Sequence, residues 1–338
     1  MFKRAIMVAA VAAAVSAPAF AEVSISGSAE MDLFYLTGPK TFNQEIAIVL
    51  NFNGSDKLDT GDTLKWKVAQ KVATDYRYDS FGNREAWIGY AGSWGELRFG
   101  NQFSNTYLMM DWPYGTKGAG NLFADTVISV GGQYASYFSP NFGGFSFAAQ
   151  YDMGTGSKDG TAYDLTASFA SGDLNLDAAY YATQDATQAQ NAANGKGNSI
   201  KFVNGQDNAM WMVGGRYNFG SFGVKAAYKG TEMKNGASKT SQDQYLVSAN
   251  TSVDKSTFTL TYSQILDSEK NGKDVNDGVK QLAFQWDYSL SKNTGAFLQA
   301  RYQDFDSALN PAIGWGFDGR QAGKDNSARV LIGTWTGF

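Results

Sequence analysis

The feature that most constrains the fold of this chain is an alternation of apolar and polar residues that returns along most of its length. In residues 257–262, for example, Phe258, Leu260 and Tyr262 alternate with threonines. Successive side chains of a β-strand point to opposite faces, so this period of two predicts strands with one apolar and one polar face. We predict sixteen such segments, near residues 22–36, 43–53, 62–74, 83–91, 95–102, 132–139, 145–152, 161–170, 173–182, 208–219, 222–231, 242–252, 256–266, 279–290, 293–304 and 326–338.

The connections between these segments alternate in length. The short ones lie near residues 92–94, 143–144, 172, 220–221, 254–255 and 291–292, and the long ones near 103–131, 183–207, 232–241, 267–278 and 305–325. Short turns at one end and long loops at the other are typical of outer-membrane barrels, whereas a soluble β-sandwich has no reason to alternate its loops in this way. We therefore expect an all-β fold, a 16-stranded antiparallel transmembrane β-barrel with lipid on its apolar face, water in its lumen and both termini at the short-turn end.

Residues 1–21 are predicted to be a signal peptide and residues 22–338 the barrel. Lys3 and Arg4 form a basic start, an alanine-rich apolar stretch follows, and Ala19-Phe20-Ala21 is a cleavage site of the small-x-small type. The alternative is an N-terminal membrane anchor. The apolar stretch is short for a helix that spans a bilayer, however, and Pro18 interrupts its end.

The composition excludes several classes of function. The chain has no histidine and no cysteine, so a Ser–His hydrolase, a thiol enzyme and a disulfide scaffold are excluded. We expect no enzyme, because a protease built on two aspartates has no motif to support it; an adhesive or structural barrel is the other alternative. Without Lys3 and Arg4 the 28 basic residues become 26, against 32 acidic ones, so the net charge is about −6 and no nucleic-acid partner is expected.

No cofactor and no metal site is predicted. One predicted loop carries a group of acidic residues, but their spacing matches no calcium-binding loop: Asp267, Glu269, Asp274 and Asp277.

Three stretches resemble the general porins of Gram-negative bacteria, in particular the neisserial and β-proteobacterial type. Residues 54–75 read GSDKLDTGDTLKWKVAQKVATD, residues 82–102 read GNREAWIGYAGSWGELRFGNQ, and residues 134–151 read YASYFSPNFGGFSFAAQY. The terminal Phe338 resembles the assembly-signal residue of that family. The resemblance implies a homotrimer in the lipid of the outer membrane, a water-filled channel for passive diffusion of small hydrophilic solutes and ions, and a third long loop folded into the lumen.

Candidate residues for the narrowest part of the pore follow from charge and parity. A charged side chain that faces lipid at the midplane costs roughly 2–4 kcal/mol, so basic residues on the third to fifth predicted strands should face the lumen. They predict a basic wall opposite the inserted loop, formed by Lys65, Lys67, Lys71, Arg84 and Arg98. The alternative is a set of lumen charges away from the narrowing. The loop offers Asp111 and Asp125 as opposing acids, unless these are merely solvated.

The same loop is rich in aromatic residues, namely Tyr107, Trp112, Tyr114 and Phe123. They allow two interpretations. The rings could stack on a class of solutes, which would make the channel substrate-specific, or they could pack the loop against the barrel wall. We favour packing.

The chain departs from the family pattern at positions where the resemblance implies arginines. Val49 and Asn101 stand there, and residues 335–338 read Trp-Thr-Gly-Phe in place of a basic ending. A thinner basic wall predicts a preference for neutral solutes and cations rather than anions.

Overall fold

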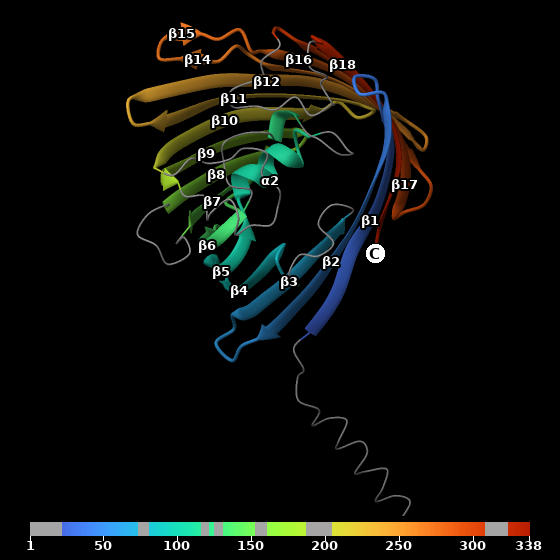
Figure 1. Ribbon diagram of the computed structural model, residues 1–338. Coiled ribbons are helices and arrows are strands. Elements are labelled where there is room, and N and C mark those ends of the chain that lie inside the picture. The colour runs from blue at the N-terminus through green and yellow to red at the C-terminus, as the bar shows by residue number, and fades with distance from the viewer. Residues whose placement is uncertain are drawn as a thin grey trace, which may run out of the picture.

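The chain folds into one closed β-barrel (Figure 1). The computed structural model describes residues 22–73, 81–115, 122–124, 131–152, 161–186, 205–307 and 324–338. Within these ranges eighteen strands form a single antiparallel sheet, which closes because β1 pairs with both β2 and β18. Two of them, β14 and β15, form a hairpin in a loop, and the other sixteen form the wall.

The strands are β1 (Glu22–Leu36), β2 (Thr41–Lys57), β3 (Thr63–Ala73), β4 (Glu85–Gly92), β5 (Gly95–Phe103), β6 (Gly131–Phe138), β7 (Phe145–Asp152), β8 (Thr161–Ser171), β9 (Leu174–Ala186), β10 (Gln206–Asn218), β11 (Phe222–Asn235), β12 (Ser238–Val253), β13 (Ser256–Ile265), β14 (Glu269–Lys270), β15 (Lys273–Asp274), β16 (Val279–Ser289), β17 (Thr294–Phe305) and β18 (Asn326–Gly337). Each of the sixteen predicted segments overlaps one wall strand, so the predicted barrel is confirmed. The predicted signal peptide lies outside the described residues.

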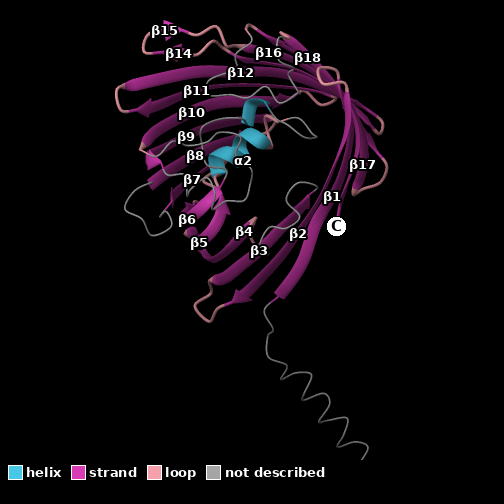
Figure 2. Ribbon diagram, viewed as in Figure 1, coloured by secondary structure: helices cyan, strands magenta, loops and turns pink. Residues whose placement is uncertain are grey.

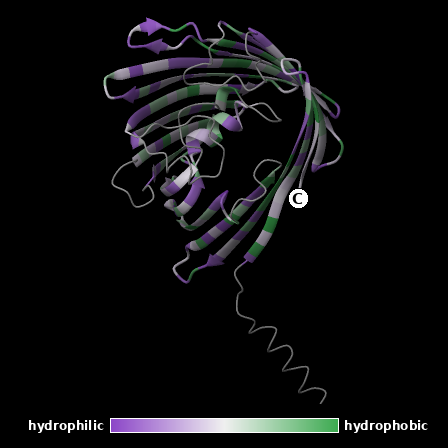
Figure 3. Cartoon of the chain, viewed as in Figure 1, coloured by the Kyte–Doolittle hydropathy of each residue, from purple (hydrophilic) through white to green (hydrophobic). Residues whose placement is uncertain are grey.

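Each wall strand separates its side chains by parity, as the alternation predicts. On β13, Leu260 is exposed on the outer surface while Thr261 is buried toward the lumen. Hydrophilic and hydrophobic residues alternate along the strands in Figure 3. The outer surface therefore has the apolar character that lipid requires, and the polar residues are left for the lumen.

Two parts of the predicted layout are wrong in detail. The segment 232–241, predicted as a long loop, continues β11 and β12 to a two-residue turn at Gly236 and Ala237. The predicted loop near 267–278 contains the β14–β15 hairpin, which pairs with β12. Both differences extend the wall at the long-loop end.

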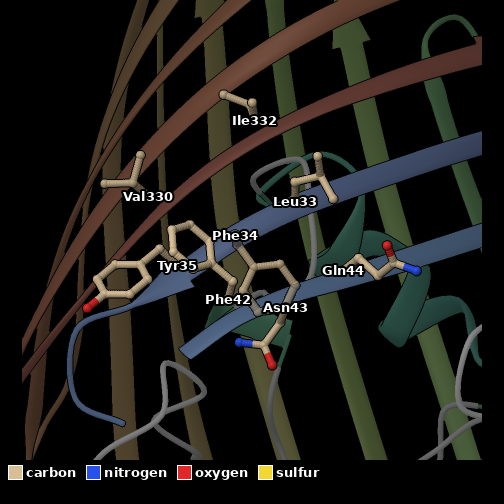
Figure 4. Close-up of a pocket in the computed structure, with 8 residues that line it drawn as sticks. All are labelled: Leu33, Phe34, Tyr35, Phe42, Asn43, Gln44, Val330 and Ile332. Carbon is tan, nitrogen blue, oxygen red and sulfur yellow. The ribbon is translucent and has the colours of Figure 1, made fainter. Parts of the chain in front are cut away.

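The outer surface holds a groove between the ends of β1, β2 and β18 (Figure 4). Its lining is mostly apolar and consists of Leu33, Phe34, Tyr35, Phe42, Asn43, Gln44, Val330 and Ile332. At the short-turn end, Trp94 stacks between Tyr90 and Tyr137, with ring centroids 6.2 and 6.5 Å apart. In the described part of the chain, no helix is both long and apolar enough to cross a membrane.

The short helix α2 (Asn105–Asp111) and the 3-10 turn η1 (Leu122–Ala124) lie inside the barrel, where Figure 2 shows α2 in cyan against the strands. Both belong to the connection between β5 and β6, which is the third long loop. The inward path that the family resemblance implies is therefore observed.

Candidate functional site: the pore constriction

The constriction loop (residues 104–130, described at 104–115 and 122–124) starts at a buried carboxylate. Asp164 on β8 is fully buried and accepts hydrogen bonds from Ser104 Oγ at 2.6 Å, Thr106 Oγ1 at 2.5 Å and Thr106 N at 3.1 Å. Ser104 is also the N-cap of α2, since its hydroxyl accepts from the backbone N–H of Tyr107. One carboxylate thus fixes the point where the chain turns into the lumen.

A second polar contact holds the segment after the helix. Tyr114 is buried, and its hydroxyl donates to Asp177 Oδ2 of β9 at 2.9 Å. Asp177 also pairs with Arg216 of β10 at 3.1 Å and accepts from Ser168 of β8 at 2.7 Å. Burial and the Asp177 carboxylate raise the pKa of Tyr114 well above that of an exposed tyrosine, so it remains a neutral donor.

Apolar packing covers the rest of the interface between loop and wall. One cluster joins loop residues to β8–β12 and contains Met110, Tyr114, Phe123, Ala162, Ala179, Tyr181, Met210, Met212, Ala227 and Leu246. A smaller cluster places Leu122 of η1 against Ile265, Val279 and Phe305. The loop is therefore packed like a protein core on this side of the lumen.

Four of the predicted basic residues lie on the lumen face of β3 and β5 and are paired with acids, whereas Arg84 precedes β4. Lys65 lies 3.0 Å from Glu96, Lys67 lies 2.5 Å from Glu85, and Lys71 lies 3.8 Å from Glu45. Glu96 also bonds Arg98 at 2.5 Å. The wall is a ladder of ion pairs rather than a purely basic surface.

Aromatic rings hold the two arginines. The Arg98 guanidinium lies 4.3 Å from the ring centroids of both Trp87 and Phe138. Arg84 precedes β4, one residue outside the strand, and lies 4.8 Å from the Phe103 ring. Cations in such positions are attracted to the ring faces, which keeps their charge at a fixed place.

The two predicted loop acids are only partly placed. Asp111 ends α2 and is half-buried. Asp125 lies outside the described residues. The role of both acids stays a prediction.

The four loop aromatics separate into two kinds. Tyr114 and Phe123 are buried in the wall cluster, and Tyr107 stacks on Phe103 with centroids 5.9 Å apart. The surface of Tyr114 and Phe123 is taken up by packing, and their role as solute contacts stays a prediction. Trp112 is 81% exposed and can meet a solute.

Sequence reasoning missed the acidic half of the wall and a second group of cations. Glu45, Glu85 and Glu96 share the parity of the lumen-facing residues on their strands, and that parity was the available signal. The second cationic group faces the lumen from β10, β11, β17 and β18 and consists of Arg216, Lys225, Lys229, Arg301 and Arg329.

The loop acids predicted not to form a calcium site have other contacts. Asp277 accepts from Ser268 N at 2.7 Å and from its hydroxyl at 2.9 Å. Across the described ranges no group of three or more acidic, cysteine or histidine side chains could hold a metal ion.

Comparison with known proteins places this arrangement in a family. Residues 8–308 match the family model described as Gram-negative porin. The chitoporin of Vibrio furnissii is 24% identical over 333 residues, which cover 84% of this chain and 89% of that protein. The major outer membrane protein P.IA of Neisseria meningitidis serogroup A is 34% identical over 119 residues, 32% of this chain and 29% of that protein.

Solved structures agree with the fold. The anion-selective porin from Comamonas acidovorans superposes with a TM-score of 0.77 at 16% identity, covering 94% of this chain and 100% of that one. The trimer form of OmpT from Vibrio cholerae superposes with a TM-score of 0.71 at 14% identity, covering 94% and 99%.

The closed barrel and its inward loop define an outer-membrane channel. The chain belongs to the Gram-negative porin family. This confirms the resemblance, the outer-membrane location and the expectation of a channel rather than an enzyme.

Proposed function

We propose that this porin is a general diffusion channel for small hydrophilic solutes and ions, with a weak preference for neutral solutes and cations. The observation that carries the proposal is the pairing of the wall charges. Lys65, Lys67, Lys71 and Arg98 all lie within 3.8 Å of a glutamate. A close pair of opposite charges acts on a passing ion as a dipole, whose field falls off faster than that of a single charge.

The loop supports the same conclusion. Of the loop rings, Tyr114 and Phe123 are buried in packing and Tyr107 packs against the same cluster. A pore whose β3–β5 charges are paired and whose loop rings are mostly packed discriminates mainly by size.

Reversal potentials in planar bilayers across a KCl gradient test the ion preference. We expect a K⁺/Cl⁻ permeability ratio slightly above one for the unmodified protein. The double variant Asp111→Asn, Asp125→Asn should lower this ratio. Each removed charge should lower it about twofold if that charge lies ~8 Å from the path of the ions. A strong anion preference of the unmodified protein would contradict the proposal. Unchanged potentials in the variant would exclude the two acids as selectivity residues.

A sugar-selective channel is the second candidate, and the exposed Trp112 is the observation that favours it. An indole ring on the loop can stack on the apolar face of a sugar, and the chitoporin of Vibrio furnissii is among the relatives. Liposome swelling separates the candidates. A rate that falls steadily with solute size supports general diffusion, whereas a rate that saturates for one sugar class and loses saturation in Trp112→Ala supports the second.

We also propose that the protein assembles as a homotrimer in outer-membrane lipid. Support comes from the family and from the existence of a trimer form of OmpT. Conductance that closes in three equal steps, together with a trimer-sized band on an unheated SDS gel, is the expected result. Single-step closure of a monomer-sized species would contradict it.

A further inference from the structure

Two lysines of β11 reach the constriction loop through backbone carbonyls. Lys225 Nζ donates to Pro113 O at 3.2 Å and to Gly115 O at 2.9 Å. Lys229, four residues along the same face of β11, is fully buried and donates to Phe123 O. Its Nζ also lies 3.8 Å from Met110 Sδ and 4.9 Å from the centroid of the Phe123 ring.

The chemistry of these contacts suits the holding of a loop. Carbonyl groups that lie outside a helix or sheet need donors once they are buried, and an ammonium group supplies three. Hydrogen bonds from a charged donor are also stronger than those between neutral groups. The two lysines bind the segment after α2 and the turn η1, which are separate parts of the same loop.

The same contacts hold the two ammonium groups against the loop, with their charge unchanged because the acceptors are neutral carbonyls. Lys229 has no exposed surface, and Lys225 is occupied by two loop carbonyls. Lys65, on the wall formed by β3–β5, differs in both respects, because its side chain is 41% exposed and it bonds Glu96 rather than the loop.

We propose that Lys225 and Lys229 are positioning residues, which fix the constriction loop against β11 and so set the width of the pore. The inference rests on the channel function proposed above and names what regulates its narrowest part.

Single-channel recordings of Lys225→Met and Lys229→Met test the proposal. Loss of one charged donor should raise the population of channels with a detached loop about tenfold. The expected readouts are a noisier open current and a changed single-channel conductance. The variant Lys225→Arg should behave like the unmodified protein, because a guanidinium can also donate hydrogen bonds to two carbonyls.

Lys65→Met is the matched control, since it removes a lumen lysine that does not touch the loop. It should shift the reversal potential toward cations and leave the open current as quiet as that of the unmodified protein. If the two β11 variants behave like this control, the positioning role is overturned. If the unmodified protein forms no pores, the channel function itself is overturned.

Lysine labelling of the unmodified protein gives an independent result if a variant does not fold. After reductive methylation of the folded protein, peptide mass spectrometry should find Lys65 modified and both β11 lysines unmodified. Modification of Lys225 and Lys229 at the rate of Lys65 would overturn the attachment to the loop.

Discussion

At the scale of the residue, acidic and basic side chains on the lumen wall are paired, so neutralising an acid leaves its basic partners without a compensating charge. Glu96 bonds both Lys65 and Arg98, so Glu96→Gln leaves two cations without the carboxylate between them. We expect the K⁺/Cl⁻ permeability ratio to fall about twofold, because a unit charge ~8 Å from an ion in water shifts its energy by ~0.5 kcal/mol. Reversal potentials at low salt, where screening is weakest, measure the change.

Glu232→Gln is the matched control for this experiment. Glu232 also lies between two lysines, at 2.8 Å from Lys234 and 2.6 Å from Lys239, but it belongs to the outward-facing positions of β11. The control should leave the permeability ratio unchanged. An equal shift in both variants would show that the effect does not come from the lumen wall.

Parity within a strand predicted the cations of the wall but not their partners. Lys65 and Lys67 occupy alternate positions on one strand, so their common face could be predicted. Their partners come from β4 and β5, and which residue lies nearby depends on the register between strands, which the pattern within one strand does not fix. Asp164 was missed for the same reason, because it binds a loop some 60 residues earlier in the chain.

At the scale of the element, the alternation on each strand predicts opposite responses to a charge at adjacent positions. Leu260 lies on the outer surface near the middle of β13, and Thr259 faces the lumen. Leu260→Lys should lower the free energy of unfolding by about 2–4 kcal/mol, the cost of a lysine in lipid at the midplane, whereas Thr259→Lys should be nearly neutral. Urea titration of the folded, gel-shifted form measures both, and equal losses would contradict the assigned faces.

The constriction loop is the element whose position depends most on a single side chain. Asp164→Asn keeps the shape of the residue but removes the charge and one acceptor oxygen from three hydrogen bonds. We expect a stability loss of about 1–3 kcal/mol together with a noisier open current. Asp243→Asn is the control, because Asp243 bonds Tyr228 at 2.6 Å on the outer surface. A loss of stability without a change in the open current would show that Asp164 stabilises the barrel wall but does not hold the constriction loop.

Turns were the least predictable elements, although one of them carried a clear signal. The predicted loop 232–241 contains Asn235-Gly236, a dipeptide typical of tight hairpins, and Gly236 has a φ of 57°. The many polar residues of this segment favoured a loop because polarity alone does not distinguish a loop from a strand that extends beyond the membrane. The predicted number of wall strands is nevertheless correct, because it depends on the number of alternating segments and not on where each segment ends.

At the scale of the whole molecule, the barrel closes where the first and last strands meet. In β1 and β18, Ser28 pairs with Gly337 and Leu36 pairs with Arg329. The pairing continues to the last residue, because Gly27 N donates to Phe338 O at 2.9 Å and Phe338 N donates to Gly27 O at 3.1 Å. Closure leaves no free sheet edge, which a barrel in lipid requires. The role of Phe338 as an assembly signal stays a prediction, but its backbone is part of the closing ladder.

Gly27 is the position where this closure can be tested. A Cβ added there would lie 2.1 Å from the backbone oxygen of Val49 and 2.7 Å from the ring of Phe338, so either β2 or the chain end must move. Gly27→Ala should therefore destabilise the barrel by about 1–3 kcal/mol, as overpacking does in protein cores. Gly295→Ala is the matched control, since its Cβ would meet only Tyr288 O, at 3.4 Å. The measurement is the temperature at which the folded band on an SDS gel converts to the unfolded one. A lower temperature for Gly27→Ala alone supports closure at Phe338. Equal temperatures for both variants would show that the contact between Gly27 and Phe338 does not hold the barrel closed.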